Sequence, residues 1–286
     1  MISPGKSGME RIGDRREGAA SSSPVFSLRL LRLAIPMLML IFLLGLWQGA
    51  VTLAGIPHYI LPSPLRIGET LIADWPILGP ALWVTLRITF AALALALVGG
   101  VLLAILLVQS RWIELALYPY AVILQVTPIV AISPLILIYA PTTEIALLIC
   151  AFLVAFFPIL SNTMQGLKST DHNLLDLFEL YGASRWQQLI FLRIPSGLPY
   201  FLAGLRIAGG LALIAAVVAE FAAGSAGASS GLAFRLMESQ FRLNIPRLFA
   251  ALFLLSLTGV AIFASTSLLS HLLLRKWHES ALRREK

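Results

Sequence analysis

The residues of this chain that could take part in catalysis are few and widely spaced. Its four histidines are His58, His172, His271 and His278, and none lies in an HExxH pattern. Hydrolysis or group transfer would need a nucleophile with a base, paired carboxylates or clustered metal ligands. The single cysteine, Cys150, excludes a disulfide or a CxxC motif within the chain. An intramembrane enzyme is therefore the alternative that these residues disfavour.

Three charged residues lie inside long apolar stretches, where charges are costly and usually functional. They are Arg87, Arg206 and Glu220. We expect Arg87 and Glu220 to lie at a similar depth and to meet on the outer side, as a structural ion pair or as part of an outer gate. Arg206 and Glu220 share a helix about 21 Å apart, which is too far to pair. Arg206 is expected nearer the cytoplasm, where its side chain can reach the interface.

The elements that carry these residues are predicted to be membrane spans. The chain is 58% hydrophobic and 12% charged, with a mean hydropathy of +0.88, whereas a soluble domain is about 25% charged. The apolar stretches predict an all-α integral membrane protein with about six spans. These spans are residues 33–53, 85–108, 120–139, 143–164, 197–223 and 249–273.

The remaining segments are predicted to be tails and loops. Residues 1–28 are rich in Gly, Ser and Arg, which predicts a disordered cytoplasmic tail. Residues 29–275 are predicted to form the membrane domain, and residues 276–286 a second cytoplasmic tail. A cleaved signal peptide is the alternative for the first apolar stretch, although that stretch exceeds the usual 7–15 residues. The net charge of +7 comes from clusters beside the spans, so no nucleic-acid partner is expected.

The basic residues predict the orientation, because short loops rich in Lys and Arg stay in the cytoplasm. With six spans and both termini inside, fifteen basic residues lie on the cytoplasmic side and four on the other. This places residues 168–196 in the cytoplasm. Within that loop, Asp171 or Asn173 can cap a short helix that ends at Gly182. Ser184 can cap a second helix, which we expect Pro195 to stop.

This cytoplasmic loop carries more apolar residues than a solvated loop needs, including Leu180, Tyr181 and Trp186. Apolar surface outside the bilayer indicates a protein partner. Packing on the inner ends of the spans is the alternative. The loop resembles the EAA loop of binding-protein-dependent ABC transporter permeases, in which Glu-Ala-Ala precedes a glycine and then Ile-x-Leu-Pro. The matching positions here are Asp176, Leu177, Phe178, Gly182, Leu192, Ile194 and Pro195.

The resemblance to the nitrate, sulfonate and taurine branch of these permeases covers roughly residues 60–275. It includes GASRWQQLIFLRIPSGLPYFLAGLRIA and AVVAEF. It implies a type I (MetI-like) importer fold in the bacterial inner membrane, and a coupling helix seated in an ATPase groove, with Glu179 and Arg185 among the coupling residues. Leu177 and Phe178 replace both alanines of the motif, which suggests a groove particular to its own ATPase.

The resemblance also implies partners. These are a dimer of ABC ATPase subunits, an extracytoplasmic solute-binding protein and a second copy of this chain. No cofactor is expected on the chain itself, because no GxxxxGK[ST] pattern is present and a partner would use the ATP. Sulfonates, taurine, nitrate, bicarbonate and thiamine- or flavin-type precursors remain open as solutes.

The third predicted span is the most polar and the most interrupted by proline. We expect it to line the transport pathway, since backbone groups freed by proline are tolerated only against protein or water. An ordinary kinked packing helix is the alternative. The pathway candidates are Gln125, Thr127, Pro128, Ser133 and Pro134. An ion-coupled carrier or channel is the other functional alternative, although neither midplane relays nor repeated halves are evident.

Overall fold

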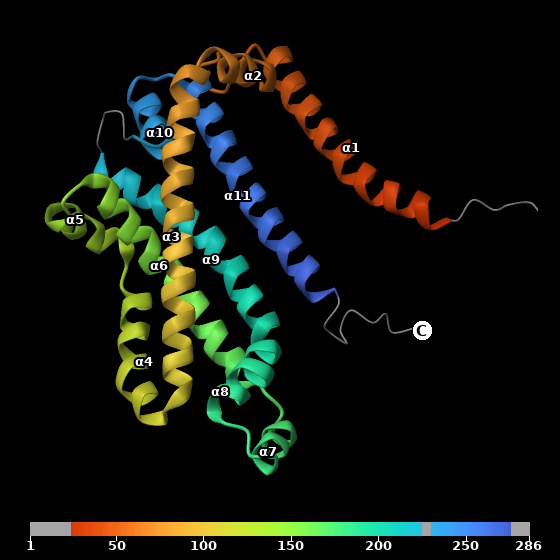
Figure 1. Cartoon of the computed structure of the whole chain (residues 1–286). Helices are drawn as coiled ribbons and strands as arrows, with labels where there is room; N and C mark the ends of the chain where they lie inside the picture. Colours follow the sequence, from red (N-terminus) through yellow and green to blue (C-terminus); the bar gives the residue numbers. More distant parts are fainter. Residues whose placement is uncertain (1–23, 225–229, 276–286) are drawn as a thin grey trace, which may run out of the picture. The chain divides into compact units, whose positions relative to one another are not determined.

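The structure is a computed structural model that describes residues 24–224 and 230–275, with side chains from residue 34 onward. These residues form helices only (Figure 1). The chain divides into two units, Met1–Ala50 and Val51–Lys286, which we describe separately. Most of α1 (Pro24–Leu53) belongs to the first unit, and its candidate span is Ala34–Leu53. The helix begins inside the segment predicted as a tail, and residues 1–23 of that tail lie outside the described residues.

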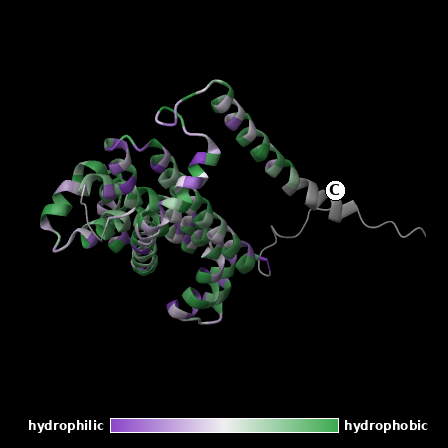
Figure 2. Cartoon of the chain, turned by 90° about the horizontal axis from the view of Figure 1, so that it is seen from above, coloured by the Kyte–Doolittle hydropathy of each residue, from purple (hydrophilic) through white to green (hydrophobic). Residues whose placement is uncertain are grey.

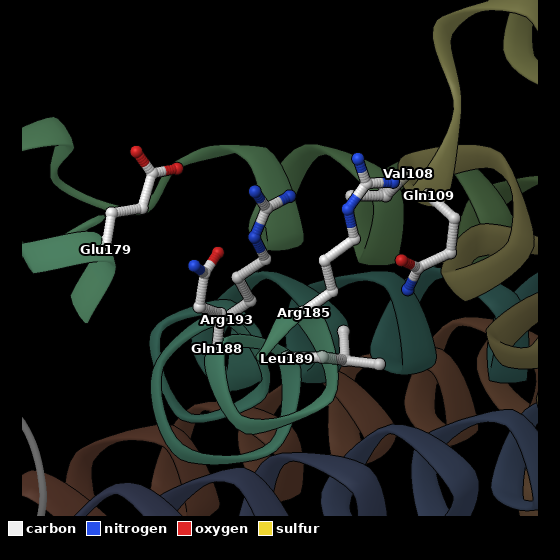
Figure 3. A pocket seen from close by; sticks show the side chains of 7 residues that line it. All are labelled: Val108, Gln109, Glu179, Arg185, Gln188, Leu189 and Arg193. Atoms are coloured by element: carbon white, nitrogen blue, oxygen red, sulfur yellow. The ribbon is translucent and has the colours of Figure 1, made fainter. Parts of the chain in front are cut away.

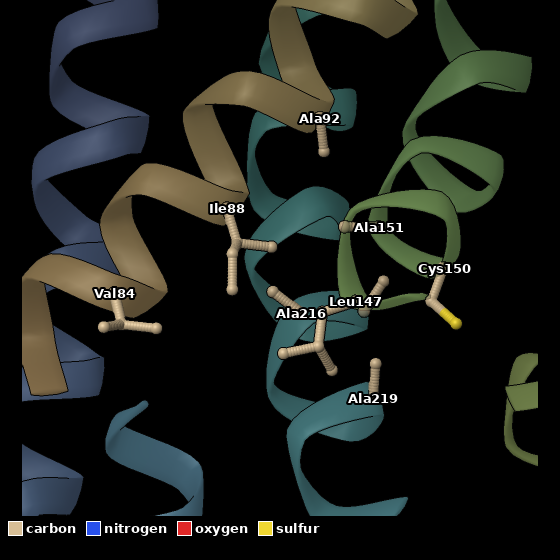
Figure 4. Close-up of a cluster of buried hydrophobic side chains, with 9 residues drawn as sticks. Val84, Ile88, Ala92, Leu147, Cys150, Ala151, Ala216 and Ala219 are labelled. Atoms are coloured by element: carbon tan, nitrogen blue, oxygen red, sulfur yellow. The ribbon is translucent and has the colours of Figure 1, made fainter. Parts of the chain in front are cut away.

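The second unit is a bundle built on three long helices. They are α3 (Trp75–Gln109), α6 (Thr143–Lys168) and α9 (Ile194–Ala223), and α6 packs along both of the others. Near one end of the bundle, Val84 and Ile88 of α3 lie against Leu147 of α6 and Ala216 of α9 (Figure 4). These side chains are buried. The three helices therefore share one core instead of packing as separate pairs.

Small residues let these helices approach closely. A Cβ on Gly166 would lie 2.8 Å from the carbonyl oxygen of Gly197, and one on Gly204 2.8 Å from the carbonyl oxygen of Pro158. A Cβ on Gly100 would lie 2.9 Å from the Ile159 side chain, and one on Gly209 would lie 2.9 Å from the Ile262 side chain. Small residues at interfaces are typical of helix pairs in membranes, where the backbones must approach for van der Waals packing. The Gly166–Gly197 contact was not predicted.

The third predicted span is not one straight helix. It consists of α4 (Arg111–Val126) and α5 (Ile129–Tyr139), which meet at an angle of 99° around Thr127 and Pro128. Pro128 has no amide hydrogen to continue the ladder, and Thr127 before it is extended, with ψ 122°, the conformation that a following proline favours. α4 packs on α3, whereas α5 packs on α6 and α9.

Short helices lie at the two ends of the bundle (Figure 1). α2 (Pro64–Ala73) and α10 (Leu232–Phe241) lie at the end where α3 begins, together with the start of α11 (Ile245–Leu274). We call this the α10 end. α7 (His172–Leu180) and α8 (Arg185–Gln188) lie at the opposite end, which we call the α7 end.

Within the described residues, five helices are long and apolar enough to cross a membrane, or six if the bent pair counts as one span. In Figure 2 the long helices are mainly green, the colour of hydrophobic residues. Many large apolar side chains on their surfaces are exposed, such as Trp83, Leu102 and Phe253. Such a surface suits lipid or other membrane helices as its environment.

Candidate coupling surface and polar sites of the bundle

The loop at the α7 end folds as two helices joined at a glycine, as predicted. The Asp171 side chain accepts a hydrogen bond from the Asn173 amide at 2.8 Å and caps α7. Gly182 adopts φ +68°, in the left-handed region, which glycine enters without steric cost. The backbone therefore reverses just after α7, at the position where the glycine was expected.

The second helix of the loop also has the predicted start. The Ser184 hydroxyl accepts from the Gln187 amide at 3.3 Å, and the Gln187 side chain accepts from the Ser184 amide at 2.7 Å. This reciprocal capping box satisfies two amides that the helix leaves free. α8 is consequently set immediately after the glycine turn.

The predicted stop at Pro195 is wrong. α8 continues through a π-helical turn, η1 (Leu189–Arg193), into α9, and together they form one candidate span at Arg185–Ala223. Pro195 lies in the first turn of α9, where its missing amide hydrogen costs little because first-turn amides lack helical partners. The wider π turn accommodates the junction, so α8 and α9 are continuous through η1.

The α7–α8 loop exposes a cluster of large apolar side chains. Leu180 and Tyr181 are each 84% exposed and Trp186 is 66% exposed. We define the coupling surface as Leu177, Leu180, Tyr181, Trp186 and Phe191, all of which are exposed.

The nine predicted coupling residues divide between this loop and the bundle. Asp176, Leu177, Glu179, Gly182, Arg185 and Ile194 are exposed, and Phe178 and Pro195 are half-buried. Leu192 is buried. Leu192 therefore packs inside the protein and does not present its side chain to a partner.

The predicted ion pair between Arg87 and Glu220 is wrong. Arg87 instead pairs with Glu144 of α6, with Nη2 and Oε1 2.7 Å apart and both side chains about half exposed. Residues two apart on a helix point to nearly opposite sides, so Arg87 turns away from α9 while Thr85 faces it. The prediction placed Arg87 on the helix face that Thr85 occupies.

Glu220 is buried and its carboxylate joins three helices. Its Oε1 accepts from the Thr85 hydroxyl of α3 at 2.8 Å, and its Oε2 accepts from the Ala233 amide of α10 at 2.9 Å. Thr85 Oγ1 also accepts from the Leu232 amide at 2.9 Å. The first residues of α10 have no acceptor from their own N-cap, Gly231. Glu220 and Thr85 therefore cap α10 from outside its own segment.

The Glu220 carboxylate lies directly against Gly231, so a side chain at position 231 would have to displace it. A Cβ on Gly231 would overlap both carboxylate oxygens. This close approach shows that the start of α10 and the end of α9 are fitted to one another.

A second polar cluster at the α10 end was not predicted. Arg247 of α11 pairs with Asp74, with Nε and Oδ2 2.6 Å apart, and Glu238 pairs with Arg235 at 2.8 Å and Arg242 at 2.9 Å. The hydrogen bond from Arg235 holds the pKa of Glu238 below its usual value, and the nearby arginine charges act in the same direction. These contacts tie the turn between α10 and α11 to the start of α3. Only the 3.6-residue spacing within α10 could have suggested the local pairs.

Arg206 lies in the middle part of α9. Its guanidinium carbon is 5.9 Å from the centroid of the Phe263 ring, and its Nε is buried without a hydrogen-bond partner. Among the residues that the structure describes, no carboxylate pairs with it.

The polar residues of the third span have separate environments. The Thr127 hydroxyl donates to the carbonyl of Ile123 at 2.7 Å, directly before the break. Ser133 is fully buried and donates to the carbonyl of Val130 at 3.2 Å. Gln125, Pro128 and Pro134 are exposed on the bundle surface. Within the described chain, no three His, Cys, Asp or Glu side chains are grouped to hold a metal.

The described residues thus form a helical bundle with membrane-length apolar helices and an exposed helical loop. The sequence model of the binding-protein-dependent transport system inner membrane component matches residues 96–279. Since this is more than half of the chain, the chain belongs to that family. The resemblance inferred from the sequence is confirmed at this level.

Relatives support the same assignment. The formylaminopyrimidine transport permease protein ThiX of Halalkalibacterium halodurans is 37% identical over 242 residues, covering 84% of this chain and 94% of ThiX. The putative aliphatic sulfonates transport permease protein SsuC of Bacillus subtilis is 29% identical, covering 83% and 85%. The crystal structure of an amino acid ABC transporter with histidines has a TM-score of 0.59 at 16% identity over 71% of this chain and 97% of that chain. It therefore supports the type I importer fold alone.

Proposed function

We propose that this ABC importer permease subunit couples to a separate ATPase through the coupling surface. The observation that carries the proposal is the exposure of Leu177, Leu180 and Tyr181, large apolar side chains of α7 and its turn that lie outside the candidate spans, since apolar surface of this kind marks protein interaction sites. The loop continues through η1 into α9 without a stop. Movement of a docked ATPase would then be transmitted directly to a spanning helix.

The α7 end is the cytoplasmic end in this proposal, and both termini lie on that side. The excess of Lys and Arg in the segments assigned to the cytoplasm supports this orientation. The α10 end then faces a solute-binding protein. The exposed apolar faces of the spans and the need to enclose a pathway favour a pair of these chains as the working unit.

The solute is proposed to be a small molecule of the kinds named for the relatives, a sulfonate or a pyrimidine vitamin precursor. In the proposed pathway the helical backbone is interrupted between α4 and α5 at Thr127 and Pro128, where the pair bends by 99°. Irregular backbone at membrane depth is tolerated where it lines water or protein. This supports the third span as a pathway element.

Docking is tested by co-expressing the permease with the ATPase subunit of its own transporter and purifying the permease in detergent. Leu180→Asp with Tyr181→Asp should abolish ATPase co-purification, because two charges replace apolar contacts. The matched control is Phe241→Asp, since Phe241 is 78% exposed at the α10 end. It should leave co-purification unchanged. Equal retention of the ATPase by all variants would overturn docking at this surface.

A further inference from the structure

An apolar groove runs along the bundle on the α7 half. It has a volume of about 270 Å³ and lies between α3 and α9 over α6. Its walls include Leu97, Val101 and Ile105 of α3 and Leu198 and Phe201 of α9. The groove is open on one side, so an elongated apolar group could lie in it.

A polar pocket of about 270 Å³ lies at the α7 end, next to the last turn of α3 (Figure 3). Arg185 and Arg193 lie beside each other in it, together with the amide side chains of Gln109 and Gln188. Glu179 is on its edge, so the pocket keeps one net positive charge. In the described chain, neither arginine has a carboxylate within ion-pairing distance.

The groove and the polar pocket follow one another along the same face of α3. Leu97, Val101 and Ile105 of the groove and Val108 of the polar pocket are spaced by four, four and three residues, which keeps them on one face of the helix. The eight residue steps from Leu97 to Ile105 along the groove span about 12 Å. One leaflet contributes about 15 Å of hydrocarbon, so the groove fits within the depth of a single leaflet.

One polar group inside the groove has no partner. Thr163 of α6 lines the groove and is 6% exposed, and its hydroxyl has no hydrogen-bond partner. A buried hydroxyl without a partner is costly. Thr163 is one turn from Leu167, which lies near the polar pocket end of α6. An acceptor from a bound molecule at this depth would satisfy it.

We propose that the groove and the polar pocket together bind one anionic phospholipid of the leaflet at the α7 end. Arg185 and Arg193 hold the phosphate, the Thr163 hydroxyl donates to an ester carbonyl, and an acyl chain lies along the groove. Guanidinium groups suit phosphate because they donate paired hydrogen bonds. Basic pockets between spans on the cytoplasmic side are suited to anionic headgroups.

This site would link lipid to coupling, because Arg185 and Glu179 flank Gly182 in the α7–α8 loop. A bound headgroup would fix the loop against the end of α3. The inference needs only the membrane-spanning character of the chain and not ATPase docking, so the two proposals fail separately.

The test is native mass spectrometry of the full-length, delipidated permease titrated with phosphatidylglycerol or phosphatidylcholine of the same chains. Phosphatidylglycerol should bind at least about tenfold more tightly, and Arg185→Gln with Arg193→Gln should remove that preference. Arg111→Gln, an exposed arginine on α4 outside the pocket, is the matched control and should keep it. Equal affinity for both lipids, or loss of the preference in the control, would overturn the proposal.

A second set of variants tests whether an acyl chain lies in the groove. Leu198→Trp should weaken phosphatidylglycerol binding by filling the groove, whereas Leu252→Trp, at an exposed position of α11, should not. Glycerol phosphate without acyl chains should not compete at equal concentration. Full competition by glycerol phosphate, or unchanged binding in Leu198→Trp, would show a soluble-anion site instead. A crosslink from a cysteine at position 198 to α1 in the lipid-saturated protein would likewise overturn the assignment.

Discussion

The Thr85 hydroxyl donates to the Glu220 carboxylate at 2.8 Å while accepting from the Leu232 amide at 2.9 Å. Two spanning helices are thereby joined to the first residues of α10. Each partner is buried, so each hydrogen bond replaces solvation that is not available at this site.

The loss of stability on replacing Glu220 should be larger for a side chain that cannot form hydrogen bonds than for one that can. Glu220→Leu leaves the Ala233 amide and Thr85 hydroxyl without this acceptor and should cost about 1–3 kcal/mol. Glu220→Gln should cost less, because its oxygen can still accept from Ala233 while its amide donates to Thr85. Thermal unfolding in detergent measures both. Equal unfolding temperatures for Glu220→Leu and Glu220→Gln would contradict a capping role for Glu220.

Thr85→Val and Glu220→Leu should not be additive. Both remove the same hydrogen bond, and mutations of contacting residues couple. The double variant should therefore be less destabilised than the sum of the two single variants, by about 0.5–3 kcal/mol. Simple additivity in a detergent unfolding cycle would show that the two side chains act independently.

Gly231→Ala should displace the Glu220 carboxylate. The added Cβ would overlap both of its oxygens, so α10 should lose its cap and the protein should unfold at a lower temperature. Gly210→Ala is the matched control, because a Cβ there meets nothing within 4 Å and alanine favours a helix. Similar melting temperatures for both variants would refute the close fit at position 231.

Arg87 and Glu144 should tolerate exchange. Both side chains are about half exposed, and an exchange keeps one charge of each sign at the pair. Arg87→Glu alone should be mildly destabilising, and adding Glu144→Arg should restore stability. Adding Glu220→Arg to Arg87→Glu should instead be harmful, because it buries an arginine at the α10 cap. Restoration by the second combination would reinstate the pairing with Glu220.

Glu238 should stabilise the folded protein at neutral pH and lose this contribution in acid. Its folded pKa is lowered by the hydrogen bond from Arg235 and by nearby arginines. The contribution is therefore complete above the unfolded glutamate pKa of about 4.3 and is lost as the pH falls through the folded value. Glu238→Gln should flatten this part of the stability curve between neutral pH and pH 3. An unchanged acid slope would exclude Glu238 as the source.

The sequence predicted the elements of the α7–α8 loop because their signals are local. Asp171, Gly182 and Ser184 act on residues within three positions, and capping and left-handed φ depend on residue type. The predicted helix end at Pro195 was wrong because a proline is tolerated in the first turn of a helix, which is where Pro195 lies in α9. The π turn of η1, which joins α8 to α9, has no signal in the residue pattern.

By itself, the sequence determined the apolar parts of the spans, the capped loop and the membership of a permease family, whereas α3 begins at Trp75 and α4 at Arg111, before the predicted spans begin. Those features follow from residue type and spacing along one chain. The tertiary structure alone decided which face of each helix meets which neighbour. Arg87 and Thr85 are two residues apart, yet one pairs with Glu144 and the other with Glu220. A partner's identity depends on the rotation and crossing of helices distant in sequence, which the close contact of Gly166 with Gly197 helps to fix.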